Sequence, residues 1–190
     1  MSNKLKWAVR SGVVAMVSMG SFASGAPLAP TGLLVNGVSR PLATERDTIR
    51  FTWALADNAR GETQTAYQIL VYSNSLAANR PLPTSAWWDS GKVDSGQSAS
   101  VEYAGKALPA ATRFWWKVRV WDQTGKPGFY SRPACFDTGL NQNDWTAHYI
   151  WDGIDKANHF VYFRKRFVII NKPTSAKIYV TAVNDYLLYC

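Results

Sequence analysis

Three tryptophans, Trp87, Trp115 and Trp121, give this sequence its clearest potential for ligand chemistry. An indole presents a flat apolar face, and such a face suits the apolar face of a sugar ring. Trp115 and Trp121 fall on the same face of one predicted strand, where they would form a platform. The indoles could therefore stack on a carbohydrate, or they could cover a packing surface toward a neighbouring domain. The sequence leaves both alternatives open.

Other side chains with catalytic or metal-binding potential form no recognisable constellation. His148 and His159 lack the spacing of metal-ligand motifs, and neither has an acid placed as in a catalytic relay. Cys135 and Cys190 allow one pair at most, which excludes a disulfide-stapled scaffold and a CxxC zinc module. We therefore predict no metal and no cofactor, and we assign no catalytic residue.

The first 25 residues are predicted to be a secretory signal peptide. Lys4, Lys6 and Arg10 form a basic head, and a charge-free apolar run of about a dozen residues follows and ends in small residues. This run is shorter than the ~20 residues that span a bilayer, so we expect cleavage after Gly25 and no membrane span in the mature chain. The mature protein is then secreted or periplasmic. Loss of three basic residues lowers its formal net charge from +8 to +5.

The composition predicts a packed core and no nucleic-acid partner. Hydrophobic residues make up 47% of the chain and aromatic residues 14%, which is too apolar for a disordered chain. The basic excess is spread over both parts of the mature chain. Its one dense cluster, residues 164–166, lies in an alternating segment that is typical of a solvated strand face.

Residues 26–140 are predicted to form an all-β sandwich of the immunoglobulin or fibronectin type III kind. β-branched and aromatic residues alternate with polar ones between Gly, Pro, Asn and Asp breaks, at intervals too short for helices. This pattern predicts strands over 47–55, 65–73, 98–103, 113–122 and 130–138, a spacing typical of such a sandwich. The apolar faces of the longest strands predict a core that contains Trp53, Tyr67, Ile69, Trp116 and Val118.

A second unit is expected to begin after a polar linker. Residues 139–144 show no periodicity, and alternation resumes over 159–169 and 176–183, which predicts further strands. Two or three strands leave their edges unpaired and an apolar face uncovered. We therefore interpret residues 141–190 as the start of an incomplete second β-domain.

Five segments of the predicted sandwich carry a family resemblance through their order and spacing. They are 64–71 (QTAYQILV), 88–93 (WDSGKV), 101–105 (VEYAG), 116–122 (WKVRVWD) and 136–140 (FDTGL). Together they resemble the N-terminal region of bacterial α-L-rhamnosidases of glycoside hydrolase family 78. Residues 164–167 and 176–182 look like the opening strands of that family's second, jelly-roll-like β-domain.

The resemblance implies a role as the N-terminal accessory region of a secreted α-L-rhamnosidase. In that family an (α/α)₆ barrel carries the catalytic acids of an inverting hydrolysis of terminal α-L-rhamnose, and no residue here matches its catalytic motifs. Asp89 with Asp94, and Asp152 with Asp155, are close in sequence, but we interpret them as turn and strand-end carboxylates. The implied partners are the parent enzyme's catalytic domain and a rhamnose-containing carbohydrate.

Two other functions remain open at this point. The chain could be a free-standing carbohydrate-binding or interaction module without hydrolase activity, in which the three indoles contact sugar. It could also belong to a complete enzyme whose remaining chain lies outside this sequence.

Overall fold

The computed structural model describes residues 26–56, 63–80, 85–154, 156–183 and 185–189. The predicted signal peptide and Cys190 lie outside these ranges. The chain divides into two compact units, one ending at Trp145 and the other beginning at Thr146. No helix within the described ranges is both long and apolar enough to cross a membrane.

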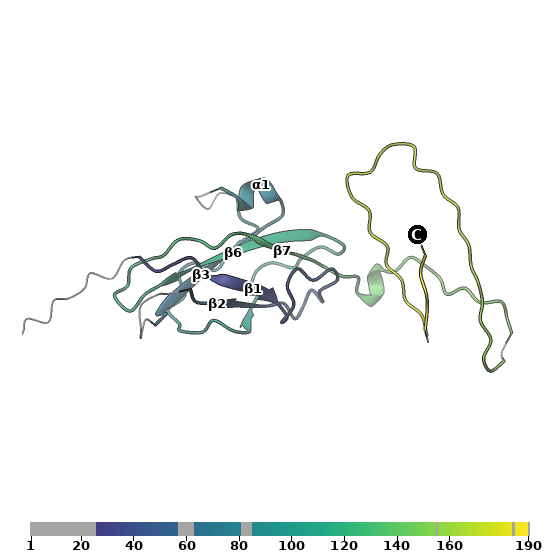
Figure 1. The fold of residues 1–190 in the computed structure, drawn as a ribbon, viewed down its shortest axis with the longest axis horizontal. Coiled ribbons are helices and arrows are strands. Elements are labelled where there is room, and N and C mark those ends of the chain that lie inside the picture. The colour runs from purple at the N-terminus through teal and green to yellow at the C-terminus, as the bar shows by residue number, and fades with distance from the viewer. Residues whose placement is uncertain (1–25, 57–62, 81–84, 155, 184, 190) are drawn as a thin grey trace, which may run out of the picture. The chain divides into compact units, whose positions relative to one another are not determined.

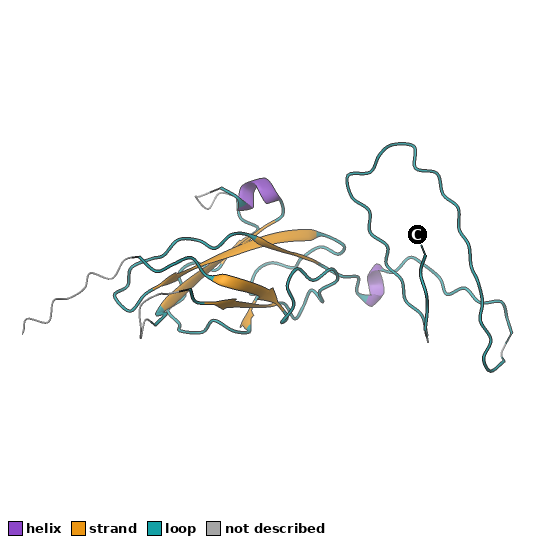
Figure 2. Cartoon of the chain, viewed as in Figure 1, coloured by secondary structure: helices purple, strands orange, loops and turns teal. Residues whose placement is uncertain are grey.

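The first unit consists of two antiparallel sheets, drawn as orange arrows in Figure 2. One sheet has the strand order β1-β2-β5, formed by Thr31–Val35, Arg50–Ala54 and Val101–Glu102. The other has the order β4-β3-β6-β7, formed by Trp88–Asp89, Ala66–Tyr72, Arg113–Trp121 and Ala134–Asp137. A single helical turn, α1 (Ser75–Ala78), and a 3₁₀ turn, η1 (Gln142–Asp144), complete the elements.

The pair β3 and β6 is the centre of the larger sheet. It is in continuous register from Ala66 opposite Trp121 to Tyr72 opposite Trp115. Because side chains alternate across a strand, one face of this pair points toward the smaller sheet and supplies the core. Figure 1 shows the two sheets as layers, with β1 and β2 on one side and β3, β6 and β7 on the other.

The core is built from interlocking aromatic rings. All five residues predicted to be in the core are buried and belong to one cluster: Trp53, Tyr67, Ile69, Trp116 and Val118. The rings of Phe51 and Trp116 lie 4.5 Å apart, and those of Trp53 and Tyr67 lie 5.3 Å apart. These contacts join the two sheets, and they confirm the predicted all-β sandwich and its inward faces.

The strand ends differ from those predicted from alternation. Within the predicted strand over 47–55 only Arg50–Ala54 (β2) forms a strand, and within 98–103 only Val101–Glu102 (β5) does. Leu55, which the period of two places on the same face as Trp53, is 43% exposed because the ladder with β1 ends at the pair Thr31 and Ala54. Alternation shows where a strand could pair, whereas its length depends on how far the neighbouring strand runs.

The structure assigns no strand to the described residues of the second unit, from 146 to 189, and so differs from the strands predicted over 159–169 and 176–183. A ladder needs a partner strand, and the alternating pattern supplies none by itself. The aromatic side chains of this unit are therefore mostly exposed: Phe160 by 81%, Tyr162 by 94% and Phe167 by 73%.

We predict that Trp116→Ala lowers the free energy of unfolding by about 3–5 kcal/mol, because it removes a fully buried ring from the middle of the core. Phe129→Ala is the matched control: that ring is 74% exposed, and its loss should change the free energy by less than about 0.5 kcal/mol. Urea titration measures both. Equal midpoints for Trp116→Ala and the parent chain would contradict the assigned core.

Candidate functional site

The outward face of the larger sheet carries two of the three predicted site residues. Here β3 presents Gln68, Leu70 and Tyr72, and β6 presents Trp115, Lys117, Arg119 and Trp121. All seven residues of β3 are buried, so both faces of this strand are covered, whereas Trp115 and Arg119 on the outward face of β6 are half-buried. Segments of the same chain, at residues 78–80 and at Tyr130, cover this face.

Trp121 lies under cationic side chains. Trp121 is only 7% exposed. The guanidinium of Arg119 lies 4.7 Å from the centre of its ring, and the ammonium of Lys92 lies 5.7 Å from the same point. A cation over an indole face is attracted by the ring quadrupole, so this contact is itself stabilising. A sugar could stack on Trp121 only after displacing these cations.

Arg119 belongs to a hydrogen-bonded network centred on Gln68. The Gln68 side-chain oxygen accepts hydrogen bonds from Arg119 Nε at 2.9 Å and from the Tyr130 hydroxyl at 2.8 Å. Its Nε2 donates to Asp89 Oδ1 at 2.7 Å. Every polar atom of the Gln68 side-chain amide therefore has a partner, and the segment containing Tyr130 is fixed over the sheet.

Lys117 holds a second covering segment in place. The residue is 2% exposed, and its Nζ donates to the carbonyls of Ala78 at 3.1 Å and Arg80 at 2.6 Å. It also lies 5.3 Å from the ring of Tyr72 and 4.9 Å from that of Tyr130. Burial lowers the pKa of this ammonium. These contacts anchor the end of α1 and the segment up to Arg80 to the outward face.

Trp87 lies on the other side of the sheet from Trp115 and Trp121. It is partly buried, packs against the main core, and meets the ring of Phe114 edge-on at 5.4 Å. The ammonium of Lys106 lies 3.9 Å from its ring. Trp115 and Trp121 themselves are six residues apart on β6, about 20 Å along a strand. The three indoles therefore do not form one continuous platform.

Of the three indoles, Trp115 borders a groove large enough for a small ligand. The groove has a volume of about 640 Å³ and runs between β1 and β7, lined by Gly32, Leu33, Leu34, Ser39, Arg40, Trp115, Pro133, Ala134 and Cys135. Its lining combines one half-buried indole, one guanidinium and several aliphatic groups, and none of these described lining residues is acidic. This arrangement can pack against and donate hydrogen bonds to a neutral polar molecule, but it cannot supply a carboxylate for acid–base catalysis.

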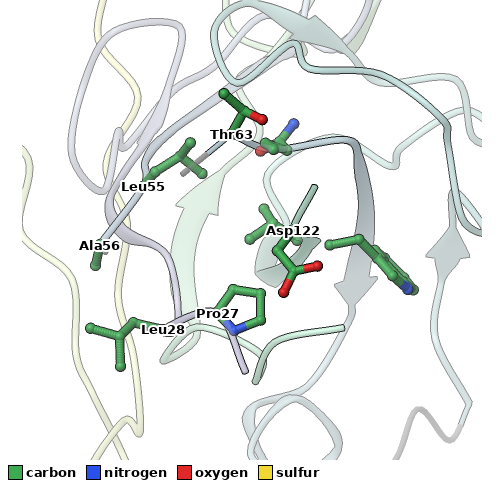
Figure 3. A pocket seen from close by; sticks show the side chains of 9 residues that line it. Pro27, Leu28, Leu55, Ala56, Thr63 and Asp122 are labelled. Carbon is green, nitrogen blue, oxygen red and sulfur yellow. The ribbon is translucent and has the colours of Figure 1, made fainter. Parts of the chain in front are cut away.

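A second cavity, of about 30 Å³, holds a buried carboxylate. Pro27, Leu28, Leu55 and other residues line it together with Asp122, and Figure 3 shows one oxygen of the Asp122 carboxylate on the side of Pro27. One carboxylate oxygen, Oδ1, accepts hydrogen bonds from the Thr124 amide at 2.8 Å, the Thr124 hydroxyl at 2.6 Å and the Lys126 amide at 2.9 Å. The other oxygen, Oδ2, is buried and has no hydrogen-bond partner in the described part of the chain.

Asp122 is ionised at neutral pH. Burial raises the pKa of this carboxyl, but the hydrogen bonds from Thr124 and Lys126 outweigh burial and leave the pKa below its usual value. The cavity is water-sized and much too small for a sugar ring, so Asp122 is not placed to act on a glycoside.

The remaining acids that are close in sequence have structural roles. Asp89 accepts hydrogen bonds from Gln68 and from the Gly91 amide, and Asp94 pairs with Lys92 at 2.9 Å. Asp155 lies outside the described residues. No group of three or more His, Cys, Asp or Glu side chains among the described residues could hold a metal ion.

The sequence did not predict a hydrogen-bonded pair in the second unit, formed by Asp152 and His159. His159 Nε2 lies 2.6 Å from Asp152 Oδ2, and its ring meets that of Trp151 edge-on at 5.8 Å. The hydrogen bond with His159 lowers the pKa of Asp152. The two residues are seven positions apart in irregular chain, and no periodicity signals such a contact. The pair closes a turn within the second unit.

The segment that leaves the first unit is fixed by an ion pair. Arg46 donates to Asp144 Oδ2 at 2.5 Å, and the same carboxylate accepts a hydrogen bond from the Asn141 amide at 2.7 Å. Both charged side chains are mostly buried, exposed by 18% and 26%. The predicted featureless linker is therefore an ordered 3₁₀ turn attached to the loop before β2.

The strand order and the buried aromatic core define an antiparallel sandwich of the immunoglobulin type. Residues 30–142 match the family described as "Rha78A-like, N-terminal immunoglobulin domain". This match covers more than half of the chain, and the chain belongs to that family, as its resemblance to glycoside hydrolase family 78 implied.

Similar proteins carry the name α-L-rhamnosidase. One from Streptomyces avermitilis is 40% identical over 117 residues, which cover 61% of this chain and 11% of the relative. One from Alteromonas sp. is 30% identical over 174 residues, which cover 84% of this chain and 18% of the relative. The chain therefore spans less than a fifth of these proteins.

Two solved structures share both fold and sequence with the chain. The S. avermitilis α-L-rhamnosidase, complexed with L-rhamnose, matches with a TM-score of 0.57 and 39% identity over 63% of this chain and 11% of that chain. The α-L-rhamnosidase from Dictyoglumus thermophilum matches with a TM-score of 0.58 and 33% identity over 63% of this chain and 13% of that chain.

We predict that Asp144→Ala accelerates amide hydrogen exchange over residues 141–145 by about tenfold or more. A hydrogen bond to a charged group contributes about 1.5–3 kcal/mol, and this carboxylate accepts two such bonds. Asp94→Ala is the control, because its carboxylate is 82% exposed and surface pairs contribute about 0–1 kcal/mol. Unchanged exchange in Asp144→Ala would show that the ion pair does not order the turn.

Proposed function

We propose that this chain is the exported N-terminal accessory region of an α-L-rhamnosidase and that it supports a catalytic domain without performing hydrolysis itself. The observation that carries the proposal is the family match over residues 30–142, an N-terminal immunoglobulin domain. In keeping with it, the described residues that line the cavity around Asp122 supply no second carboxylate, and those that line the groove beside Trp115 supply none.

Hydrolysis with inversion needs a general acid and a general base whose carboxyl groups are about 6.5–9.5 Å apart, with room for a water between the base and the sugar. Among the described residues that line these two cavities, Asp122 is the only acid. We propose that the activity, directed at terminal α-L-rhamnose, resides in a partner domain. The basic head and apolar run of residues 1–22 favour export to the periplasm or the medium, with cleavage after Gly25.

We predict that the purified chain from Ala26 to Cys190 does not hydrolyse p-nitrophenyl α-L-rhamnoside above the buffer rate. The S. avermitilis α-L-rhamnosidase, assayed in parallel, is the positive control. Steady turnover by this chain that one Asp→Asn substitution abolishes would overturn the proposal.

A chimera tests the supporting role directly. Residues 26–145 replace the corresponding N-terminal domain of the S. avermitilis enzyme, and the comparison is with that enzyme lacking the domain. We expect the deletion to lower the yield or the melting temperature and the chimera to restore both. A chimera no better than the deletion would contradict an accessory role.

The groove beside Trp115 favours a second candidate function, carbohydrate binding. A half-buried indole with a guanidinium nearby is suited to a deoxy-sugar, which has both an apolar methyl group and hydroxyls. If this function is correct, L-rhamnose shifts the NMR signals of Gly32, Trp115 and Cys135, and Trp115→Ala abolishes the shifts. Phe129→Ala, outside the groove lining, should leave them unchanged. No shift at millimolar sugar would exclude this candidate.

A further inference from the structure

The buried Asp122 carboxylate lacks a partner for one of its two oxygens. The residue is 2% exposed, three donors converge on Oδ1, and none of the described residues donates to Oδ2. A buried charged acceptor without a donor destabilises the folded state, because it has lost its water without gaining a hydrogen bond. A donor that enters the adjacent cavity would remove this cost.

Two of the residues that line the cavity come from the beginning of the described chain. Pro27 and Leu28 line it together with Asp122, and Figure 3 shows one oxygen of the Asp122 carboxylate on the side of Pro27. Pro27 is buried, and its backbone lies against Gly128, where an added Cβ would be 2.6 Å from the Pro27 carbonyl oxygen. This close contact favours glycine at 128, because a side chain there would clash with the Pro27 backbone.

Proline has no N–H, so Pro27 cannot donate to the carboxylate that faces it. The next nitrogen toward the N-terminus is that of Ala26. In the unprocessed chain this nitrogen is an amide with one N–H. Hydrolysis of the Gly25–Ala26 peptide bond by a signal peptidase consumes one water, leaves a carboxylate on Gly25 and leaves a primary ammonium group on Ala26.

We propose that the cavity at Asp122 is a binding site for a primary ammonium group and that the Ala26 ammonium of the processed chain fills it. The inference rests on the cleavage after Gly25 proposed above. An ammonium carries three donors and a positive charge, which match an ionised carboxylate with a free oxygen. A cavity of about 30 Å³ has room for a group of this size and not for a ring. Removal of the leader would thereby stabilise the fold of the domain.

Three chains that differ only in their first residue test the proposal. They begin at Gly25, Ala26 or Pro27, end at Cys190, and are released in vitro from a carrier by a protease that leaves no extra residue. Each is made with Asp122 and with Asp122→Asn. We expect the chain that begins at Ala26 to have a folding equilibrium constant about tenfold larger than the other two in urea titrations. Asp122→Asn should remove that difference.

If the Asp122→Asn variants do not fold, the chain acetylated at Ala26 provides a second test. Acetylation of Ala26 removes the charge and leaves Asp122 intact, and it should lower the stability to that of the Gly25 chain. Equal stability of all three starts would overturn the proposal and indicate that water fills the cavity. An advantage of the Ala26 start that persists unchanged in the Asp122→Asn variants would overturn it as well.

The proposed ammonium site and the proposed cleavage after Gly25 are tested by different experiments. The three ends are made in vitro, so the stability comparison does not depend on where a cell cleaves the leader. N-terminal sequencing of the exported protein tests the cleavage. An end other than Ala26 in the exported protein would contradict the processing step and leave the ammonium site to be judged on the stability data alone.

Discussion

Burial of both faces of β3 is the constraint on which the rest of the sandwich depends. One face meets the aromatic core, and the other carries a glutamine whose neighbours on β6 are Lys117 and Arg119. Two long cations on a buried face need acceptors and ring faces, since an unpaired buried charge costs several kcal/mol. The carbonyls of Ala78, at the end of α1, and of Arg80, together with the Gln68 amide and the ring of Tyr130, meet that need. The path of the covering segments follows from these contacts.

The motifs that carry the family resemblance build the scaffold. Gln64 accepts a hydrogen bond from the Trp53 indole at 3.1 Å and donates to the carbonyls of Ser95 and Gln97. Asp137 forms two hydrogen bonds with Arg113, at 2.7 and 3.0 Å, across β6 and β7. In the Trp-Asp-Ser-Gly motif, the Ser90 hydroxyl accepts a hydrogen bond from the Ile69 amide of β3. Each of these three contacts fixes an edge strand or a loop, which explains how such motifs can identify a family without marking a reaction.

Alternation in the sequence was sufficient to predict the sandwich and its core, because inward positions such as Trp53 and Trp116 follow directly from the period of two. It was not sufficient for Trp121, whose outward direction was predicted but whose cover by Arg119 and Lys92 depends on side-chain placement across strands and loops. Alternation also did not predict that Asp122 Oδ2 lacks a hydrogen-bond donor among the described residues or that Asp152 pairs with His159. They arise where irregular segments meet, and sequence period carries no information there.

The stacked guanidinium of Arg119 restricts how this surface can change in evolution. The group lies 4.7 Å from the ring of Trp121 and 4.8 Å from that of Tyr130, and its Nε also donates to Gln68. A lysine would keep the charge but lose the planar group over both rings and the directed Nε donor, so this exchange is not conservative here. Among relatives, the residues at positions 68, 119, 121 and 130 should therefore change together, as one coupled unit of four side chains, rather than drift one at a time.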